Sequence, residues 1–256
     1  MASGSSSLEA IFGPNAVALG KHSHACNYLP PREATDEAYW AWTLPPSRYQ
    51  QLMDLGFRRS GLVVYRPRCE GCNACQPMRV PVAEFRPSKS QRRVLKRNID
   101  VKMELSEPRL TPEKVDLYQR YLAAQHQGTP QDGGEASMRD FLYTSCTATL
   151  EACYRDARGA LLGVTILDLC RESLSSVYHF FEPREAKRSL GVYSILAEIE
   201  LCRAKDLPWF YLGYWIKGCP TMEYKASYQP FELLVDGVWK RARKERTSDA
   251  PRGSGQ

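Results

Sequence analysis

Apolar residues in the second half of the chain follow two alternating kinds of pattern. Between residues 189 and 205 they recur at the spacing of one helical face, as Val192, Ile195, Leu196 and Ile199, which predicts an amphipathic helix. Runs rich in β-branched and aromatic residues, bounded by turn-forming residues, predict strands. These strands are expected at 148–155, 161–169, 175–181, 209–212 and 231–235.

Helix-start signals supply the other elements. Thr111 and then Pro112 form a cap followed by proline at the first helical position, and this helix is expected to run to about residue 126, where Gly128 stops it. Ser88 predicts the start of a helix over 89–98, and a short helix is expected near 135–142. The order of helices, antiparallel strands, one long helix and further strands predicts an α+β fold with the layout of acetyltransferase-like folds.

The composition changes along the chain and predicts four segments. The two ends are rich in Gly, Ser and Ala, which is typical of disorder. The region after the first end holds four of the nine cysteines and most of the basic clustering, and it reads as a compact, loop-rich domain. The predicted segments are a flexible N-terminal segment (1–20), a Cys-rich, basic N-terminal domain (21–104), an acetyltransferase-like domain (105–243) and a disordered tail (244–256).

The charge balance is moderately basic. The chain has 256 residues, a net charge of +6 and a pI near 8.8, which permits a nucleic-acid partner but does not require one. Residues 1–20 contain no Lys or Arg, and the apolar run at 16–19 is too short for a signal segment or a membrane span. The sequence therefore predicts a cytoplasmic protein that has no membrane partner.

Three cysteines lie close together in a CxxCxxC pattern, which suits one soft metal centre. They are Cys69, Cys72 and Cys75, and Cys26 is a candidate fourth ligand. An iron–sulfur cluster and a structural zinc ion both fit four thiolates, and the alternative is that the thiols only pack. Nine cysteines is an odd number, and cytoplasmic thiols stay reduced, so a disulfide framework is not expected. The cysteines inside apolar patterns are predicted to be buried: Cys146, Cys153, Cys170 and Cys202.

A basic block follows the cysteine cluster. Between residues 86 and 98 there is no acidic residue, so the cations would repel one another unless phosphates lie between them. The alternative is a solvated helix face. We favour a contact with the backbone of a nucleic acid through these residues. The predicted nucleic-acid-binding residues are Arg86, Lys89, Arg92, Arg93, Lys96 and Arg97.

Two further stretches suit ligands. The segment that opens the helix at 189 carries cations together with Ser189 and Gly191, and a helix N-terminus of this kind favours an anionic substrate group. It holds only one glycine, unlike the glycine-rich pyrophosphate loop of acetyltransferases. Residues 211–230 are crowded with aromatic side chains around Lys225, which suits the wall of a pocket.

Taken together, these motifs resemble the aminoacyl-tRNA–protein transferases of the arginyl-transferase family, and among them the bacterial aspartate/glutamate leucyltransferase branch. The match extends in order over most of the chain. Its motifs are CNYLP (26–30), GFRRSG (56–61), the cysteine cluster, FRPSKSQRRVLKRN (85–98), YHFFEP (178–183), SLGVYS (189–194) and YLGYWIKGCPTMEYKASYQP (211–230).

The resemblance implies a Cys-bearing N-terminal domain and a C-terminal domain of acetyltransferase-like fold. It implies that leucine passes from leucyl-tRNA to the α-amine of a protein that begins with Asp or Glu, which creates an N-degron for bacterial proteolysis. No cofactor is required for this chemistry, DNA is not a partner, and the chain has no P-loop, as expected for an ester that is already activated. Relatives with a metal site carry a second cysteine soon after the first, where this chain has Leu29, so the fourth ligand stays open.

The implied reaction also assigns roles to individual residues. It makes tRNA the expected partner of the six cations at 86–97, which are the predicted tRNA-binding residues. An acidic acceptor calls for cations, and Arg58, Arg59 and Lys225 are the candidates. The attacking amine must lose a proton, which the resemblance assigns to a second group of candidates. These are Tyr178, His179 and Glu182.

Three rival functions stay open from the sequence alone. One is an arginyl-tRNA–protein transferase, which the residues do not distinguish from a leucyltransferase. Another is a CoA-dependent N-acetyltransferase, against which the single glycine at 191 and the long basic block argue. The third is a metal-bound RNA-binding module without catalysis.

Overall fold

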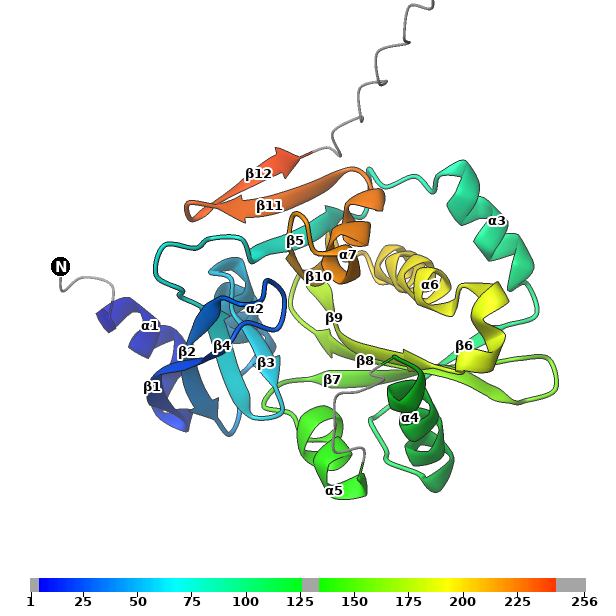
Figure 1. Cartoon of the computed structure of the whole chain (residues 1–256), viewed down its shortest axis with the longest axis horizontal. Helices are drawn as coiled ribbons and strands as arrows, with labels where there is room; N and C mark the ends of the chain where they lie inside the picture. Colours follow the sequence, from blue (N-terminus) through cyan, green and yellow to red (C-terminus); the bar gives the residue numbers. More distant parts are fainter. Residues whose placement is uncertain (1–4, 126–133, 243–256) are drawn as a thin grey trace, which may run out of the picture.

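The computed structural model describes residues 5–125 and 134–242, which form two β-sheets surrounded by helices (Figure 1). The smaller sheet is antiparallel throughout. In spatial order its strands are β1 (Ala16–Ala25), β2 (Glu33–Ala41), β4 (Val63–Pro67) and β3 (Arg58–Ser60). Helices α1 (Ser5–Phe12) and α2 (Pro46–Asp54) pack on one face of this sheet, where Phe12 stacks on Tyr39. The short 3-10 turn η1 (Gly13–Asn15) joins α1 to β1.

The larger sheet has eight strands. In spatial order they are β12 (Val238–Ala242), β11 (Phe231–Val235), β5 (Gln76–Pro81), β10 (Trp209–Trp215), β9 (Ser173–Phe181), β8 (Leu161–Leu169), β7 (Thr149–Arg155) and β6 (Lys102–Ser106). Strands β9 and β10 are parallel, and the other neighbouring pairs are antiparallel.

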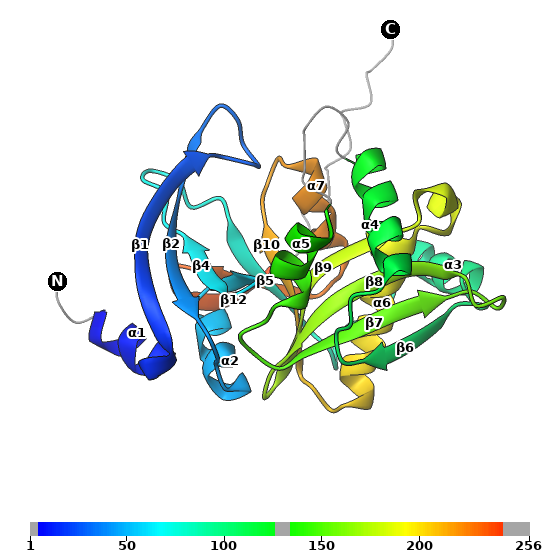
Figure 2. The ribbon, with the colours of Figure 1, turned by 90° about the horizontal axis from the view of Figure 1, so that it is seen from below.

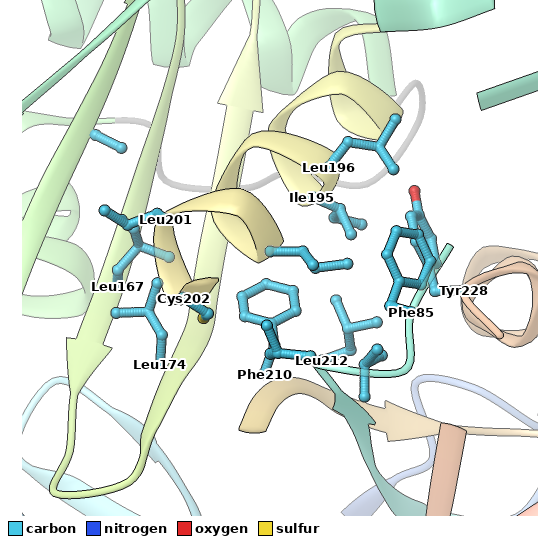
Figure 3. Packing of buried hydrophobic residues seen from close by; sticks show 14 of the residues in the cluster. Phe85, Leu167, Leu174, Ile195, Leu196, Leu201, Cys202, Phe210, Leu212 and Tyr228 are labelled. Carbon is cyan, nitrogen blue, oxygen red and sulfur yellow. The ribbon is translucent and has the colours of Figure 1, made fainter. Parts of the chain in front are cut away.

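Helices cover both faces of the larger sheet. On one face lie α3 (Lys89–Arg97) and α6 (Leu190–Ala204), and on the other α4 (Pro112–Gln125) and α5 (Glu135–Met138) (Figure 1). Ile195 and Leu196 of α6 pack toward Phe210 and Leu212 of β10 (Figure 3). Fully burying one such side chain contributes about 1.5–3 kcal/mol. The remaining short helices are η2 (Arg139–Tyr143), η3 (Pro183–Arg188), α7 (Pro220–Glu223) and η4 (Tyr224–Ser227).

The α+β class and the acetyltransferase-like layout are confirmed. Antiparallel strands β6 to β9 precede the long helix α6, and β10 then returns parallel to β9. The predicted helix over 189–205 is α6, and the helix over 89–98 is α3, which begins with a capping box between Ser88 and Gln91. The expected end of α4 at Gly128 lies outside the described residues, as does the predicted tail at 244–256.

The N-terminal region departs from the prediction. Residues 5–20, expected to be flexible, form α1, η1 and the first half of β1, because Leu8 and Phe12 are buried in the core of the smaller sheet. Strands β5 and β6 lie before residue 105 but belong to the larger sheet. The proposed division at residue 104 therefore does not separate the two sheets, and it stays a prediction about folding units.

Within 5–125 and 134–242, no helix is both long enough and apolar enough to cross a membrane.

Candidate functional site

Strands β9 and β10 pair along only part of their length. The parallel pairing joins Ser173–Ser175 to Trp209–Tyr211. Beyond it, the register of β10 with β5 shifts between Tyr211 and Tyr214, and Gly213 has a φ of +74°. A β-carbon at Gly213 would lie 3.7 Å from Lys225 Nζ. The kink therefore brings the end of β10 against a buried lysine.

Two buried cations bind the carbonyls of this kink. Lys225 Nζ donates to the Tyr214 carbonyl at 2.8 Å, and an Arg58 Nη donates to the Gly213 carbonyl at 3.3 Å. The Arg58 guanidinium lies 5.3 Å and 5.6 Å from the ring centres of Tyr211 and Tyr214. Burial, and then the charge of Arg58, lowers the pKa of Lys225 to about 7.

Neither cation is compensated by an acid. In the described part of the chain, neither Arg58 nor Lys225 forms an ion pair, and the buried Nε of Arg58 has no hydrogen-bond partner. A buried charge without a partner is costly. Such a site favours an anionic ligand that completes it.

Arg59 points away from the β10 kink and toward Asp168 of β8, although it was predicted to bind the acceptor. It forms a two-point ion pair with Asp168 at 2.7 and 2.8 Å, and both side chains are fully buried. This pairing raises the pKa of Arg59. Neighbouring residues of a strand point to opposite faces, so Arg58 and Arg59 lie on opposite sides of β3. The charge of Arg59 is neutralised by Asp168, which favours Arg58 over Arg59 as the acceptor-binding candidate.

The three predicted proton acceptors do not come together. Tyr178 packs edge-on against Tyr118 and Phe141, and burial raises its pKa. His179, next along β9, points to the opposite face. Glu182 is paired with Arg120 at 2.9 Å.

His179 is placed as a neutral, buried imidazole. Its Nδ1 bonds the Thr165 hydroxyl at 2.8 Å, while its buried Nε2 has no partner in the described residues. Burial lowers the pKa of His179 to about 4. Tyr178, His179 and Glu182 therefore lie in three different environments, and the choice among them as proton acceptor stays a prediction.

Glu198 is a titratable residue that the sequence reasoning missed. It lies on the face of α6 that packs on the sheet and is fully buried. Tyr154 Oη donates to its Oε1 at 2.9 Å, and its Oε2 has no partner in the described chain. Burial raises the pKa of Glu198 to about 7. A glutamate among Ile195, Ile199 and Cys202 on an apolar helical face was the signal that could have found it.

The basic block forms the exposed side of α3. All six predicted tRNA-binding cations are exposed. Within the residues described, none of them forms an ion pair, although Arg92 donates to the Pro87 carbonyl at 2.6 Å. The buried side of the helix carries Gln91, Val94 and Asn98.

The basic side of α3 adjoins the start of α6. The Arg97 guanidinium donates to the Lys187 carbonyl in η3, and Asn98 donates to the Arg188 carbonyl at 2.9 Å. Arg188 itself is paired with Asp100 at 2.8 Å. Ser189 and Gly191 open α6 at this point. Ser189 has a φ of +56°, and its side chain makes no capping hydrogen bond.

The four candidate metal ligands surround one cavity of about 510 Å³. Cys26 lies in the loop between β1 and β2, and the other three lie in the loop between β4 and β5. Both loops are at the same end of the molecule as α7 (Figure 2). Burial, and then the neighbouring Cys69, Cys26 and Cys72, raise the pKa of Cys75 to about 12.

The four thiols are not arranged as the ligands of one metal ion in the described residues. Across the described residues, no group of three or more His, Cys, Asp or Glu side chains is placed to hold a metal ion. The thiols are near enough to influence one another's ionisation, but they are not gathered about one point. The four-thiolate site therefore stays a prediction. The cysteines predicted to be buried are so: Cys146, Cys153, Cys170 and Cys202.

Comparison with known proteins gives matches over both parts of the chain. Residues 24–93 match the family model described as "Arginine-tRNA-protein transferase, N terminus", and residues 113–235 match the corresponding C-terminus model. A relative from Nitrosococcus oceani, named aspartate/glutamate leucyltransferase, is 43% identical over 84% of this chain and 91% of its own length. A relative of the same name from Pseudomonas fluorescens is 42% identical over 84% and 92%.

One solved structure shows partial similarity to the fold of this chain. It is the C-terminal domain of a putative lysylphosphatidylglycerol synthetase from Agrobacterium fabrum, with a TM-score of 0.48 and 15% identity, covering 75% of this chain and 62% of that one.

Proposed function

The chain belongs to the arginine-tRNA-protein transferase family, and we propose that it is an aspartate/glutamate leucyltransferase, as its relatives are named. It transfers leucine from leucyl-tRNA to the α-amine of proteins that begin with Asp or Glu. The amine nitrogen bonds to the ester carbonyl carbon, the bond from that carbon to the ribose oxygen breaks, and tRNA leaves with a free hydroxyl. Because the ester is already activated, proximity supplies much of the rate. The new N-terminal leucine is an N-degron.

The observation that carries the acceptor assignment is the pair of buried, uncompensated cations. Arg58 and Lys225 bind adjacent carbonyls of the β10 kink and lack a carboxylate partner in the described residues. The side-chain carboxylate of an N-terminal Asp or Glu supplies the missing negative charge. Its binding returns Lys225 to the charged state, and an uncharged first residue leaves both cations unpaired. Preference for acidic N-termini follows from this difference.

The exposed cations of α3 are the proposed tRNA surface. Their spacing along the helix suits phosphates, which would position tRNA without reading bases. The surface continues to η3 and the opening of α6 through the Arg97–Lys187 contact. Ser189 and Gly191 are proposed to lie beside the acceptor end of the tRNA at this helix N-terminus.

The proton that leaves the attacking amine needs only a weak base. A free α-amine has a pKa of about 8, so a fraction is already neutral near pH 7. Glu198, with its raised pKa, is our replacement for the predicted trio as the acceptor of this proton. The buried Nε2 of His179 is also unpartnered in the described residues, but its pKa of about 4 makes it a weaker base than Glu198.

A structural metal or cluster is proposed for the four cysteines, with zinc and iron–sulfur both fitting four sulfur donors. The convergence of the thiols on one cavity supports it, and a bound cation would relieve the cost of ionising them together. Its role would be to hold the two cysteine loops in place, and the transfer chemistry does not use it. Since charged tRNA is cytoplasmic, so is the proposed activity.

The decisive experiment incubates the protein with labelled Leu-tRNA or Arg-tRNA and a peptide that begins with Asp. Incorporation of leucine alone is expected. Incorporation of arginine would make the chain an arginyltransferase. Stabilisation by acetyl-CoA but not by tRNA would instead favour an N-acetyltransferase.

A further inference from the structure

The face of the smaller sheet opposite α1 and α2 carries a group of apolar residues that the proposed reaction does not use. Three of them are exposed, and Val63 is half-buried. Val17 of β1 pairs directly with Trp40 of β2, and Trp40 pairs with Val63 of β4. Val17 is 51% exposed, Trp40 38% and Leu19 42%. Single exposed apolar residues are ordinary, but a contiguous group marks an interaction surface. We call Val17, Leu19, Trp40 and Val63 the apolar strip.

The strip leads to the proposed acceptor site. Strand register places Ala38, Tyr65 and Arg58 in the next row of the same face. Leu19, Val63 and Tyr65 line the cavity of about 510 Å³, whose lining also includes Tyr214 and the four candidate metal ligands. Such a volume lies within the ~300–1,000 Å³ of ordinary ligand sites. Strand register therefore places exposed Trp40 and buried Arg58 on the same face of the sheet, one row apart.

The spacing of the sheet gives the length of this path. Arg58 and Trp40 are two strands apart and one row apart. Strands lie ~4.8 Å apart, and two residues along a strand cover about 6.8 Å, so their Cα atoms are about 12 Å apart. An extended chain advances about 3.4 Å per residue, and about three to four residues span this distance.

We propose that the apolar strip binds about the third to fifth residues of the acceptor protein, held as an extended chain whose acidic first residue is at Arg58. This inference rests on the proposed function. The occupant follows from continuity, because an acceptor anchored at Arg58 must leave the site along some surface, and this face adjoins it. The strip thereby favours acceptors with apolar residues soon after the acidic one.

The test compares short and long acceptors on the full-length enzyme. Leucine transfer is measured to an amidated Asp-Ala dipeptide and to ten-residue peptides that begin with Asp-Ala and carry either Leu or Lys at positions three to five. In the unmodified enzyme, the Leu peptide should have a KM about tenfold lower than the Lys peptide. Trp40→Ala should remove this difference and leave the KM of the dipeptide unchanged.

Three controls keep the outcomes distinct. Val238→Ala changes an apolar residue on β12 that is more exposed (57%) than Trp40 and lies outside the strip, and it should change nothing. Should Trp40→Ala lose dipeptide transfer through misfolding, Val17→Asp on the exposed edge strand provides the same comparison. tRNA affinity and oligomeric state, by sedimentation, should be the same in all variants.

Several results would overturn the inference. Equal KM values for the Leu and Lys peptides would remove it, as would a Trp40→Ala enzyme that still prefers the Leu peptide. A weaker tRNA affinity would assign the strip to tRNA, and a dimer that dissociates on Trp40→Ala would assign it to a second copy of this chain. No transfer to any acceptor by the unmodified enzyme would instead refute the proposed function.

Discussion

The proposed tRNA surface gives a prediction whose size follows from the structure. On α3, Gln91, Val94 and Asn98 are buried. At 100° per residue, Lys96 points almost directly away from the core, and Arg93 lies within about 50° of that direction. Both are exposed, and neither has an acidic partner in the described chain. Changing both to Ala removes two cations without opening a cavity or leaving a buried charge. The fold should therefore be unaffected.

The magnitude comes from counterion release. Each phosphate neutralised by a cation contributes about 0.9 to the slope of log K against log salt on a duplex, and about 0.7 on a single strand. Losing two contacts lowers the slope by about 1.4–1.8. Between 50 and 200 mM salt, the affinity of the unmodified protein for tRNA should fall about tenfold more than that of the Arg93→Ala, Lys96→Ala variant.

The assay is fluorescence anisotropy with uncharged tRNA at several salt concentrations. The matched control changes Lys205 and Lys240 to Ala, two exposed cations away from α3, and should keep the slope of the unmodified protein. If the α3 variant and the unmodified protein had the same slope, the basic side of α3 would be only a solvated face, and the tRNA would bind elsewhere.

Three other perturbations address the remaining assignments. Lys225→Met should raise the KM for Asp-starting peptides by at least about 30-fold while tRNA affinity stays the same. In the unmodified enzyme that KM should rise between pH 6 and 8, because Lys225, with its pKa of about 7, loses its charge. A fall in kcat alone would contradict the binding role. The Glu198 pKa is raised to about 7, from 4.5, so its contribution to stability is fully present below pH 4.5 and is lost as the pH rises through 7. Glu198→Gln should therefore remove a loss of about 2.5 kcal/mol in unfolding free energy between pH 5 and 8. Urea denaturation at these two pH values measures it, and the same pH dependence in both proteins would contradict it. Anaerobically purified protein should contain zinc or iron that is lost on Cys72→Ser; metal-free protein with full activity would show that the thiols only pack.

Elements whose patterns are local were predictable. The strands at 161–169 and 231–235 and the helices α3 and α6 carry their own periodicity and caps, and the structure places them within a residue or two. Strand β1 has no such signal, because nine of its ten residues are exposed. It exists because β2 pairs with it, and a pairing partner is not visible in a local pattern. Strand β5 contains two prolines, which argue against a strand in any reading of the sequence alone.

The residue types of the candidate site were predictable from the sequence, but the directions in which their side chains point were not. Lys225 was singled out because an acidic acceptor needs cations, and it is buried beside Arg58. The motif GFRRSG does not indicate which arginine points toward β10 and which toward Asp168. That depends on the register of β3 with β4 and on Asp168, which lies 109 residues further along the chain. Glu198 was overlooked for a related reason, because its burial depends on the sheet under α6.

The adjacent arginines of β3 suggest why a strand of only three residues matters. Arg59 joins the smaller sheet to β8 through its fully buried pair with Asp168. Arg58 reaches the opposite side and binds the β10 kink. Breaking a buried ion pair by removing one partner costs about 3–5 kcal/mol, so Arg59 fixes β3 firmly against the larger sheet. Because Arg58 is the adjacent residue, its backbone is fixed by the same ion pair. Its guanidinium lies beside the rings of Tyr211 and Tyr214. The chain thus neutralises one buried charge with Asp168, whereas its neighbour Arg58 has no carboxylate partner in the described residues, and the acceptor carboxylate is our proposed partner for it.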